Sequence, residues 1–168
     1  WYPTNQRSTR GALYMREVFF RPEVEEDAPP IENGQFPVMI FSHGSVAIAE
    51  QSYFLTEFLA SHGWMVIAPD HEGNTIFDVA SPPETYFLRP LDLTAALDRF
   101  EALPADDPLA GRMGDTTVVC GHSFGGYSTL TLAGAQFSVP WIRDACANGE
   151  RPRSECDVLL QPQILELF

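Results

Sequence analysis

The chain has 168 residues, the size of one ordinary domain, and 45% of them are hydrophobic, which is enough for a buried core. Ten basic side chains stand against 23 acidic ones, a formal net charge of -13, which disfavours binding to nucleic-acid phosphates or anionic lipid headgroups. All ten basic residues are arginine, and the lack of lysine excludes a Schiff-base enzyme, a Ser-Lys hydrolase and a Walker-type phosphate loop.

The cysteines and the hydropathy narrow the class further. Cys120, Cys146 and Cys156 have no C-x-x-C spacing, and we expect neither a metal site nor a cofactor. Cys120 lies in an apolar run and is expected to be a small buried residue. Cys146 and Cys156 lie in a polar loop where a disulfide could form, which slightly favours a periplasmic or secreted protein over a cytoplasmic one. No apolar run reaches the roughly 18 residues of a membrane span.

The first 36 residues carry few periodic signals. Trp1–Pro3 has the pattern of a strand end, so we expect further chain upstream. Residues 4–36, with the acidic, proline-bearing run 23–30, are predicted to form a long surface loop. Within this loop, residues 13–20 are ambiguous between a short strand and a helical turn.

From Phe36 onward, short apolar runs alternate with amphipathic ones. The apolar runs predict strands buried on both faces at 38–41, 64–68 and 117–120. Apolar stripes predict a helix over 50–61 and a second helix opened by Pro90, and a small-residue helix follows to about Ala135. The first stripe consists of Phe54, Leu55, Phe58 and Leu59, and the second of Leu93, Ala96, Leu97, Phe100 and Leu103.

This alternation predicts βαβ units, and therefore an α/β fold with a mostly parallel sheet and helices on both faces. In such sheets the functional groups lie beyond the carboxyl ends of the strands. Three loops follow strand ends in this way: Ser42–Ser45, Asp70–Thr75 and Gly121–Gly126.

Residues Gly121–Gly125 match the pattern G-x-S-x-G, which is typical of a nucleophile elbow. A serine on a sharp strand-to-helix turn has a strained backbone, and its neighbours two residues away must lack side chains that would clash. Gly121 and Gly125 meet this need, and Gly126 is expected to let the next helix pack close to the sheet. The pattern alone is weak, but a predicted strand ends before it and a predicted helix begins after it. We therefore predict that Ser123 is a nucleophile.

A serine nucleophile also needs N–H groups that stabilise the oxyanion. In this architecture one donor is the backbone N–H of the residue after the nucleophile, here Phe124. The second comes from a loop after an earlier strand, and the loop Ser42–Ser45 fits this place. Gly44 would allow the tight bend that turns the Ser45 N–H inward.

Three segments, 41–44, 59–63 and 121–126, read F-S-H-G, L-A-S-H-G and G-H-S-F-G-G. Together they resemble the α/β-hydrolase superfamily, and more narrowly the bacterial dienelactone-hydrolase-like and platelet-activating-factor-acetylhydrolase-like serine esterases. The resemblance covers most of residues 36–135. It implies one partial α/β-hydrolase domain over residues 1–168, truncated after the nucleophile-elbow helix. Dienelactone hydrolases proper use a cysteine nucleophile, so Ser123 favours the serine-esterase branch.

The histidines depart from the pattern of this superfamily. The catalytic acid and histidine of the superfamily follow the nucleophile in chain order, but His43, His62, His71 and His122 all precede Ser123. His71, in a loop at the functional edge, is kept as a possible lining of the substrate pocket or an unusual base, against a role that only braces the loop.

The acid is unassigned as well. Asp144 and Asp157 follow the nucleophile in the chain, but no buried strand precedes them. Asp70 and Asp92 are better explained as a turn residue and a helix-start residue. We therefore expect the triad acid and base to lie in chain beyond residue 168.

The leading hypothesis is a serine hydrolase acting on small-molecule or lipid esters of carboxylic acids, with no nucleic-acid partner and no integral membrane segment. A serine peptidase of the same fold is an alternative, because the elbow does not distinguish ester from amide. A non-catalytic α/β binding module without a triad is another.

Overall fold

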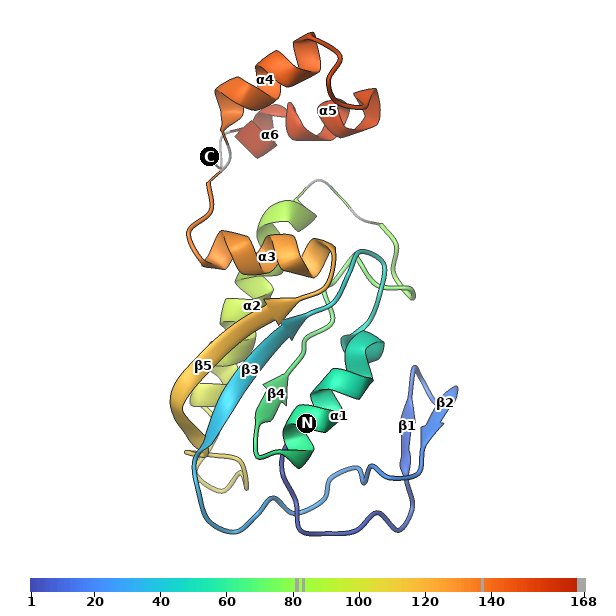
Figure 1. Ribbon diagram of the computed structural model, residues 1–168, viewed down its shortest axis with the longest axis vertical. Helices are drawn as coiled ribbons and strands as arrows, with labels where there is room; N and C mark the ends of the chain where they lie inside the picture. The colour runs from blue at the N-terminus through green and yellow to red at the C-terminus, as the bar shows by residue number, and fades with distance from the viewer. Residues whose placement is uncertain (81, 83, 137, 166–168) are drawn as a thin grey trace.

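The computed structural model describes residues 1–80, 82, 84–136 and 138–165. Its centre is a three-stranded parallel sheet in the order β4-β3-β5, formed by β3 (Phe36–Ser42), β4 (Met65–Ile67) and β5 (Met113–Gly121) (Figure 1). In the register, Val38 of β3 lies opposite Met65, and Ile40 lies opposite both Ile67 and Val119. All three strands therefore end at the same edge of the sheet.

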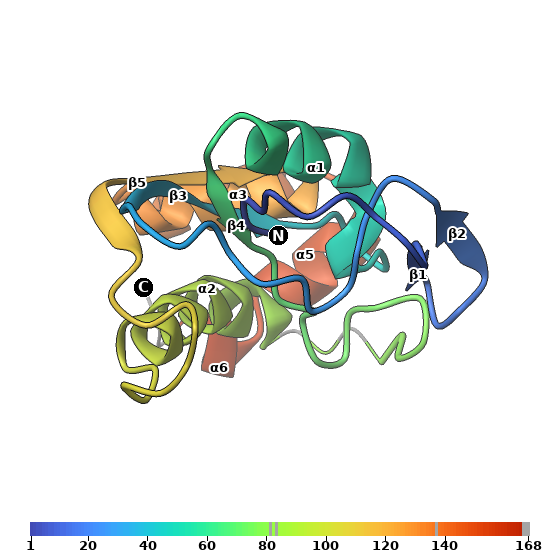
Figure 2. The same cartoon turned by 90° about the horizontal axis from the view of Figure 1, so that it is seen from below.

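Helices cover both faces of this sheet, which confirms the predicted α/β class. Seen from below, α1 (Tyr53–Ser61) and α2 (Thr85–Glu101) lie on opposite sides of the strands (Figure 2). A 3-10 helix, η1 (Ala49–Ser52), leads into α1, and α3 (Phe124–Leu132) packs against β5, β3 and α2.

Side chains of β3 alternate between two apolar clusters, one on each face of the sheet. Val38 and Ile40 pack with Leu93 of α2 in one cluster. Met39 and Phe41 pack with residues of β4 and α1 in the other. The central strand is therefore buried on both faces, as its continuous apolar run predicts.

The structure corrects two predictions of burial. Thr117 is exposed in β5 and Val118 is 38% exposed, because β5 is an edge strand of the sheet in the part of the chain that is described. In α1, Phe54 and Phe58 are 68% and 57% exposed, and only Leu55 and Leu59 of the predicted stripe pack on the sheet.

The start of α2 also differs from its prediction, because Pro90 lies inside the helix rather than at its beginning. A proline has no N–H, so it donates no hydrogen bond to the carbonyl four residues earlier, which here belongs to Tyr86. The Tyr127 hydroxyl of α3 donates to that carbonyl instead, at 3.0 Å. This contact compensates for the missing backbone bond and ties α3 to α2.

The N-terminal segment is tied to the domain at two places. Trp1 exchanges two backbone hydrogen bonds with Val66 at the outer edge of β4, at 2.9 and 2.8 Å. The ambiguous stretch forms an antiparallel hairpin of β1 (Ala12–Tyr14) and β2 (Phe19–Arg21). Arg21 of this hairpin forms a bidentate ion pair with Glu57 of α1, at 2.9 and 2.6 Å.

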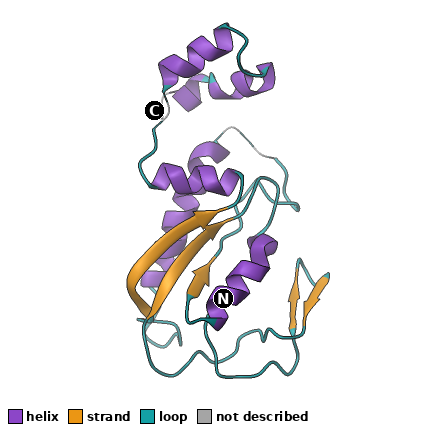
Figure 3. Ribbon diagram, in the orientation of Figure 1, coloured by secondary structure: helices purple, strands orange, loops and turns teal. Residues whose placement is uncertain are grey.

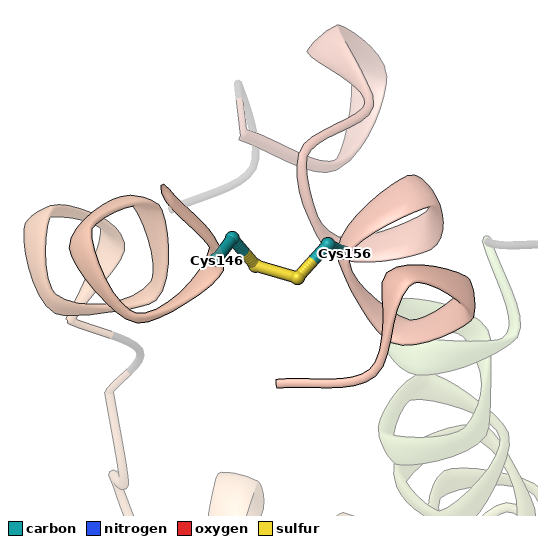
Figure 4. Close-up of a disulfide and its surroundings, with 2 residues drawn as sticks. All are labelled: Cys146 and Cys156. Atoms are coloured by element: carbon teal, nitrogen blue, oxygen red, sulfur yellow. A yellow bond between two sulfur atoms is a disulfide. The ribbon is translucent and has the colours of Figure 1, made fainter. Parts of the chain in front are cut away.

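Three short helices follow α3: α4 (Val139–Ala147), α5 (Arg153–Leu159) and α6 (Pro162–Leu165). They pack on one another and lie beyond α3, apart from the sheet (Figure 3). A disulfide joins Cys146 of α4 to Cys156 of α5 (Figure 4). Cys120 is a free, partly buried thiol on β5. Among the described residues, no helix combines the length and hydropathy needed to cross a bilayer.

The disulfide leads to a first prediction. Alkylation of the unfolded protein without reductant should add one label, at Cys120, and alkylation after reduction should add three. Intact mass spectrometry measures both numbers. Three labels before reduction, in protein taken from its native compartment, would contradict the bond.

Candidate active site

Ser123 lies on the sharp turn between β5 and α3, and its side chain is exposed. Its backbone has φ 54° and ψ -114°, a conformation that L-residues rarely adopt. Such strain is characteristic of functional sites that the surrounding structure holds in place. The elbow predicted from the G-x-S-x-G pattern therefore has the strained geometry that the pattern implies.

Two glycines of the elbow allow a close approach between the turn and the end of β3. A methyl group at Gly125 would overlap the carbonyl oxygen of Ser42, and one at Gly121 would overlap the backbone of Gly125. The His122 N–H also donates to the Ser42 carbonyl, at 3.1 Å. Gly126 differs from its prediction, because a methyl group there would meet only the Gly121 carbonyl oxygen, at an ordinary 3.7 Å.

The loop that carries Ser45 is linked to the elbow by the side chain of Gln51. The Gly44 N–H donates to Gln51 Oε1 at 2.7 Å, and Gln51 Nε2 donates to His122 Nδ1 at 3.1 Å. Because a backbone N–H can only donate, the Gly44 contact fixes which end of the amide faces each partner. Gln51 is not recognisable from the sequence, since nothing in its local pattern indicates a bridge to residue 122.

The two backbone groups predicted to hold an oxyanion lie on these two linked segments. Phe124 is the first residue of α3, where a helical N–H has no acceptor within the helix. Ser45 is exposed, and its hydroxyl accepts a hydrogen bond from Asn74 Nδ2 at 3.3 Å. The structure therefore anchors both segments, one by the helix and one by side-chain contacts.

A buried arginine supports these segments from the interior of the domain. Arg89 of α2 is 0% exposed, and its guanidinium donates to Asn74 Oδ1 at 2.6 Å, to Ser42 Oγ at 3.1 Å and to the His43 carbonyl. The ring of Phe124 covers it, with 4.8 Å from the guanidinium carbon to the ring centroid. Burial lowers the pKa of Arg89 to about 10, so it stays charged at neutral pH.

His71 does not line an open pocket, which corrects its prediction. Its ring is 0% exposed, with Nε2 at 2.9 Å from Ser42 Oγ and Nδ1 at 2.7 Å from Asp92 Oδ2. Asp92 lies within α2 rather than at its start, and its carboxylate orients this ring.

The order Ser42, His71, Asp92 has the connectivity of a catalytic triad. Ser42 is also fully buried, however, and its oxygen already accepts from Arg89. A substrate carbonyl has no access to this oxygen. The contacts of these three residues brace the loop after β4 against β3 and α2, and among the described residues none of them joins His71 to Ser123.

The remaining candidates have other partners. Asp70 Oδ1 accepts from the Ala49 N–H at 2.7 Å, and His62 Nδ1 caps α1 by donating to the Phe58 carbonyl at 2.8 Å. Asp144 and Asp157 lie in the helices beyond α3. Among the described residues, no histidine or carboxylate forms a hydrogen bond with Ser123, and the acid and base stay unassigned.

The strained serine elbow, at the carboxyl edge of a parallel sheet covered on both faces, defines an α/β-hydrolase-type protein. Residues 27–140 match the chlorophyllase family. The chain therefore belongs to that family, within the superfamily that the sequence motifs indicate.

Two relatives are similar over the same part of the chain. The chlorophyllase type 0 of Chenopodium album is 30% identical over 124 residues, which cover 70% of this chain and 34% of that protein. The structure of a ferulic acid esterase from Streptomyces cinnamoneus matches with a TM-score of 0.56 and 25% identity, over 68% of this chain and 37% of that one. The chain thus spans about a third of the length of these relatives.

The buried histidines lead to a prediction about pH. Burial lowers the pKa of His43 to about 4, opposed by its hydrogen bond to the Gly44 carbonyl, and burial also lowers the pKa of His71 against the opposing contact with Asp92. An unfolded histidine titrates near pH 6.5, so below that pH the unfolded state binds more protons than the folded state. The free energy of unfolding should fall by about 2 kcal/mol or more between pH 7 and pH 5.

Denaturant unfolding at pH 7, 6 and 5 measures this change. His43→Asn should flatten the pH dependence, while Gln6→Asn, at an exposed position of the N-terminal segment, should leave it unchanged. An equal slope in both variants would contradict the assignment.

Proposed function

We propose that the protein carrying this chain is a serine hydrolase of carboxylic esters, with Ser123 as its nucleophile. The observation that carries the proposal is the strained, exposed serine at the strand-to-helix turn. Relatives described as a chlorophyllase and a ferulic acid esterase support ester chemistry. The serine at the elbow also supports the serine-esterase branch over the cysteine enzymes of the dienelactone-hydrolase type.

In this mechanism Ser123 Oγ attacks the ester carbonyl carbon, and the hydroxyl proton passes to a general base. The negative oxygen of the tetrahedral intermediate accepts hydrogen bonds from the N–H groups of Phe124 and Ser45. The alcohol leaves, and water then attacks the acyl-Ser123 ester to release the acid and restore the hydroxyl. In this mechanism the chain supplies the nucleophile and the oxyanion donors, while no described residue is assigned as the general base or as its acid.

The first prediction of this proposal concerns Ser123. Ser123→Ala should lower kcat for p-nitrophenyl acetate by at least about 10⁴-fold and abolish labelling by a fluorophosphonate probe, because no other group replaces the attacking oxygen. Ser154→Ala, at an exposed position of α5, is the matched control. Labelling that persists in Ser123→Ala would place the nucleophile elsewhere. A peptide substrate turned over faster than esters would favour the peptidase alternative.

A second prediction tests Gln51 as a positioning residue for the oxyanion donors. Gln51→Met keeps the length of the side chain but removes both hydrogen bonds that join Gly44 to His122. It should lower kcat for a small acetate ester by about 10-fold, because a donor loop held less precisely stabilises the transition state less.

Gln51→Glu should retain most of the rate. Its carboxylate still accepts from the Gly44 N–H, and it can accept from the other tautomer of His122. Gln6→Met, at an exposed position, is the control. Equal losses in the Met and Glu variants, or a change confined to KM, would contradict the positioning role.

A further inference from the structure

A small apolar pocket lies between the N-terminal hairpin and the loop that follows Ser45. Its lining includes Tyr14 and Phe19 of the hairpin, and Val46, Ile48 and Tyr53 of the segment that leads into α1. Its volume is about 290 Å³. The hairpin stands beside α1 (Figure 1), and the rings of Phe19 and Tyr53 lie 5.1 Å apart.

This pocket is joined to the candidate active site through two residues. Gln51 lines it and also binds the Gly44 N–H and His122. Val46 lines it and directly follows Ser45, the expected oxyanion donor. A larger hollow of about 930 Å³ lies between the hairpin, the N-terminal segment and α1, but the residues that line it belong to neither the Ser45 loop nor the elbow.

The strained backbone of Val46 supports a functional role for this pocket. Its φ of 53° is costly for a β-branched residue, whose side chain crowds the backbone there. Neighbouring contacts hold the loop in this conformation, since the Ile76 N–H donates to the Ala47 carbonyl at 3.3 Å. Ile76 itself lines the same pocket.

We propose that this pocket binds the apolar group of the ester during its reaction at Ser123, an inference that rests on the proposed function. Its volume exceeds the roughly 150 Å³ of a cavity that holds benzene, so it accommodates one ring or a branched chain. Glu50 is the charged side chain among its lining residues, which disfavours an anionic occupant. The expected occupant is thus a neutral aromatic or branched aliphatic group.

Ala47→Leu should test the pocket, because it adds bulk to the lining without removing a hydrogen-bonding side chain. Two ester series separate the acyl from the alcohol side: p-nitrophenyl acetate against p-nitrophenyl benzoate, and methyl acetate against benzyl acetate. In one series kcat/KM for the bulky member should fall at least 10-fold, with less than a 2-fold change for its small member. The series that responds identifies the side of the ester that enters the pocket.

Two comparisons control this experiment. Ala95→Leu makes the same change on the exposed face of α2 and should alter neither series. Ile76→Ala widens the pocket and should favour bulky esters instead. Bulky and small esters that respond equally to Ala47→Leu would overturn the proposal.

A binding measurement separates this proposal from the proposed function. In Ser123→Ala, benzyl acetate should shift the methyl NMR signals of Ile48 and Ile76 but not that of Ile142 in α4, and Ala47→Leu should remove the shifts. Such shifts, together with an unsubstituted protein that hydrolyses no ester, would keep the pocket and reject the function. Esterase activity with neither shifts nor size selection would keep the function and reject the pocket.

Discussion

A buried guanidinium holds together the loops at the carboxyl edge of this sheet. Arg89 is fully buried and binds the end of β3 through Ser42 and the His43 carbonyl, and the loop after β4 through Asn74. The ring of Phe124 lies over its face. An ionised group in a protein interior is tolerated only when acceptors surround it. The loops that supply these acceptors therefore cannot move apart without leaving the guanidinium charge buried and unpaired. One cation from α2 thereby fixes three segments that follow separate strands.

Two strained backbones lie on the segments that this arrangement holds. Ser123 and Val46 both have positive φ values, of 54° and 53°. Conformations of this kind cost of order 1–3 kcal/mol each and persist only where neighbouring contacts determine them. For Ser123 those contacts are the packing of Gly125 on the Ser42 carbonyl and the bond from the His122 N–H. The buried network and the strained surface residues are therefore parts of one arrangement, in which contacts inside the domain maintain the geometry outside it.

The sequence predicts the parts of this architecture that depend on local patterns. Strands such as 38–41 are apolar runs, and the elbow at Ser123 is a contiguous motif, so both follow from neighbouring residues. The sequence-based predictions are wrong where contacts between residues far apart in the chain determine the structure. Pro90 reads as a helix start because its missing N–H is unfavourable inside a helix, and only the Tyr127 hydroxyl of α3 compensates for it. A helix that begins at Pro90 leaves out Arg89, although this residue lies four residues before Leu93 and so on the same buried stripe of α2. The pairing of His71 with Asp92 joins a loop to a helix, and no local pattern marks it.

The polar groups at the carboxyl edge of the sheet differ in solvent exposure. Exposure distinguishes the residues that brace the loops from the proposed nucleophile. Ser42, His71 and Arg89 are fully buried, and their hydrogen bonds are directed at one another. Ser123 and Ser45 are exposed, and their segments lie on opposite sides of the Gln51 bridge. Ser42 therefore lies beside a histidine and an arginine but has no access to a substrate. Ser123, in contrast, is exposed and has a strained backbone. Because a reaction with an external ester needs access first, the hydrogen-bonded Ser42–His71–Asp92 series is explained as scaffolding, even though its connectivity is that of a triad. The same reasoning assigns the buried Ser128, whose oxygen lies 3.5 Å from Arg89 Nε, to the scaffold as well.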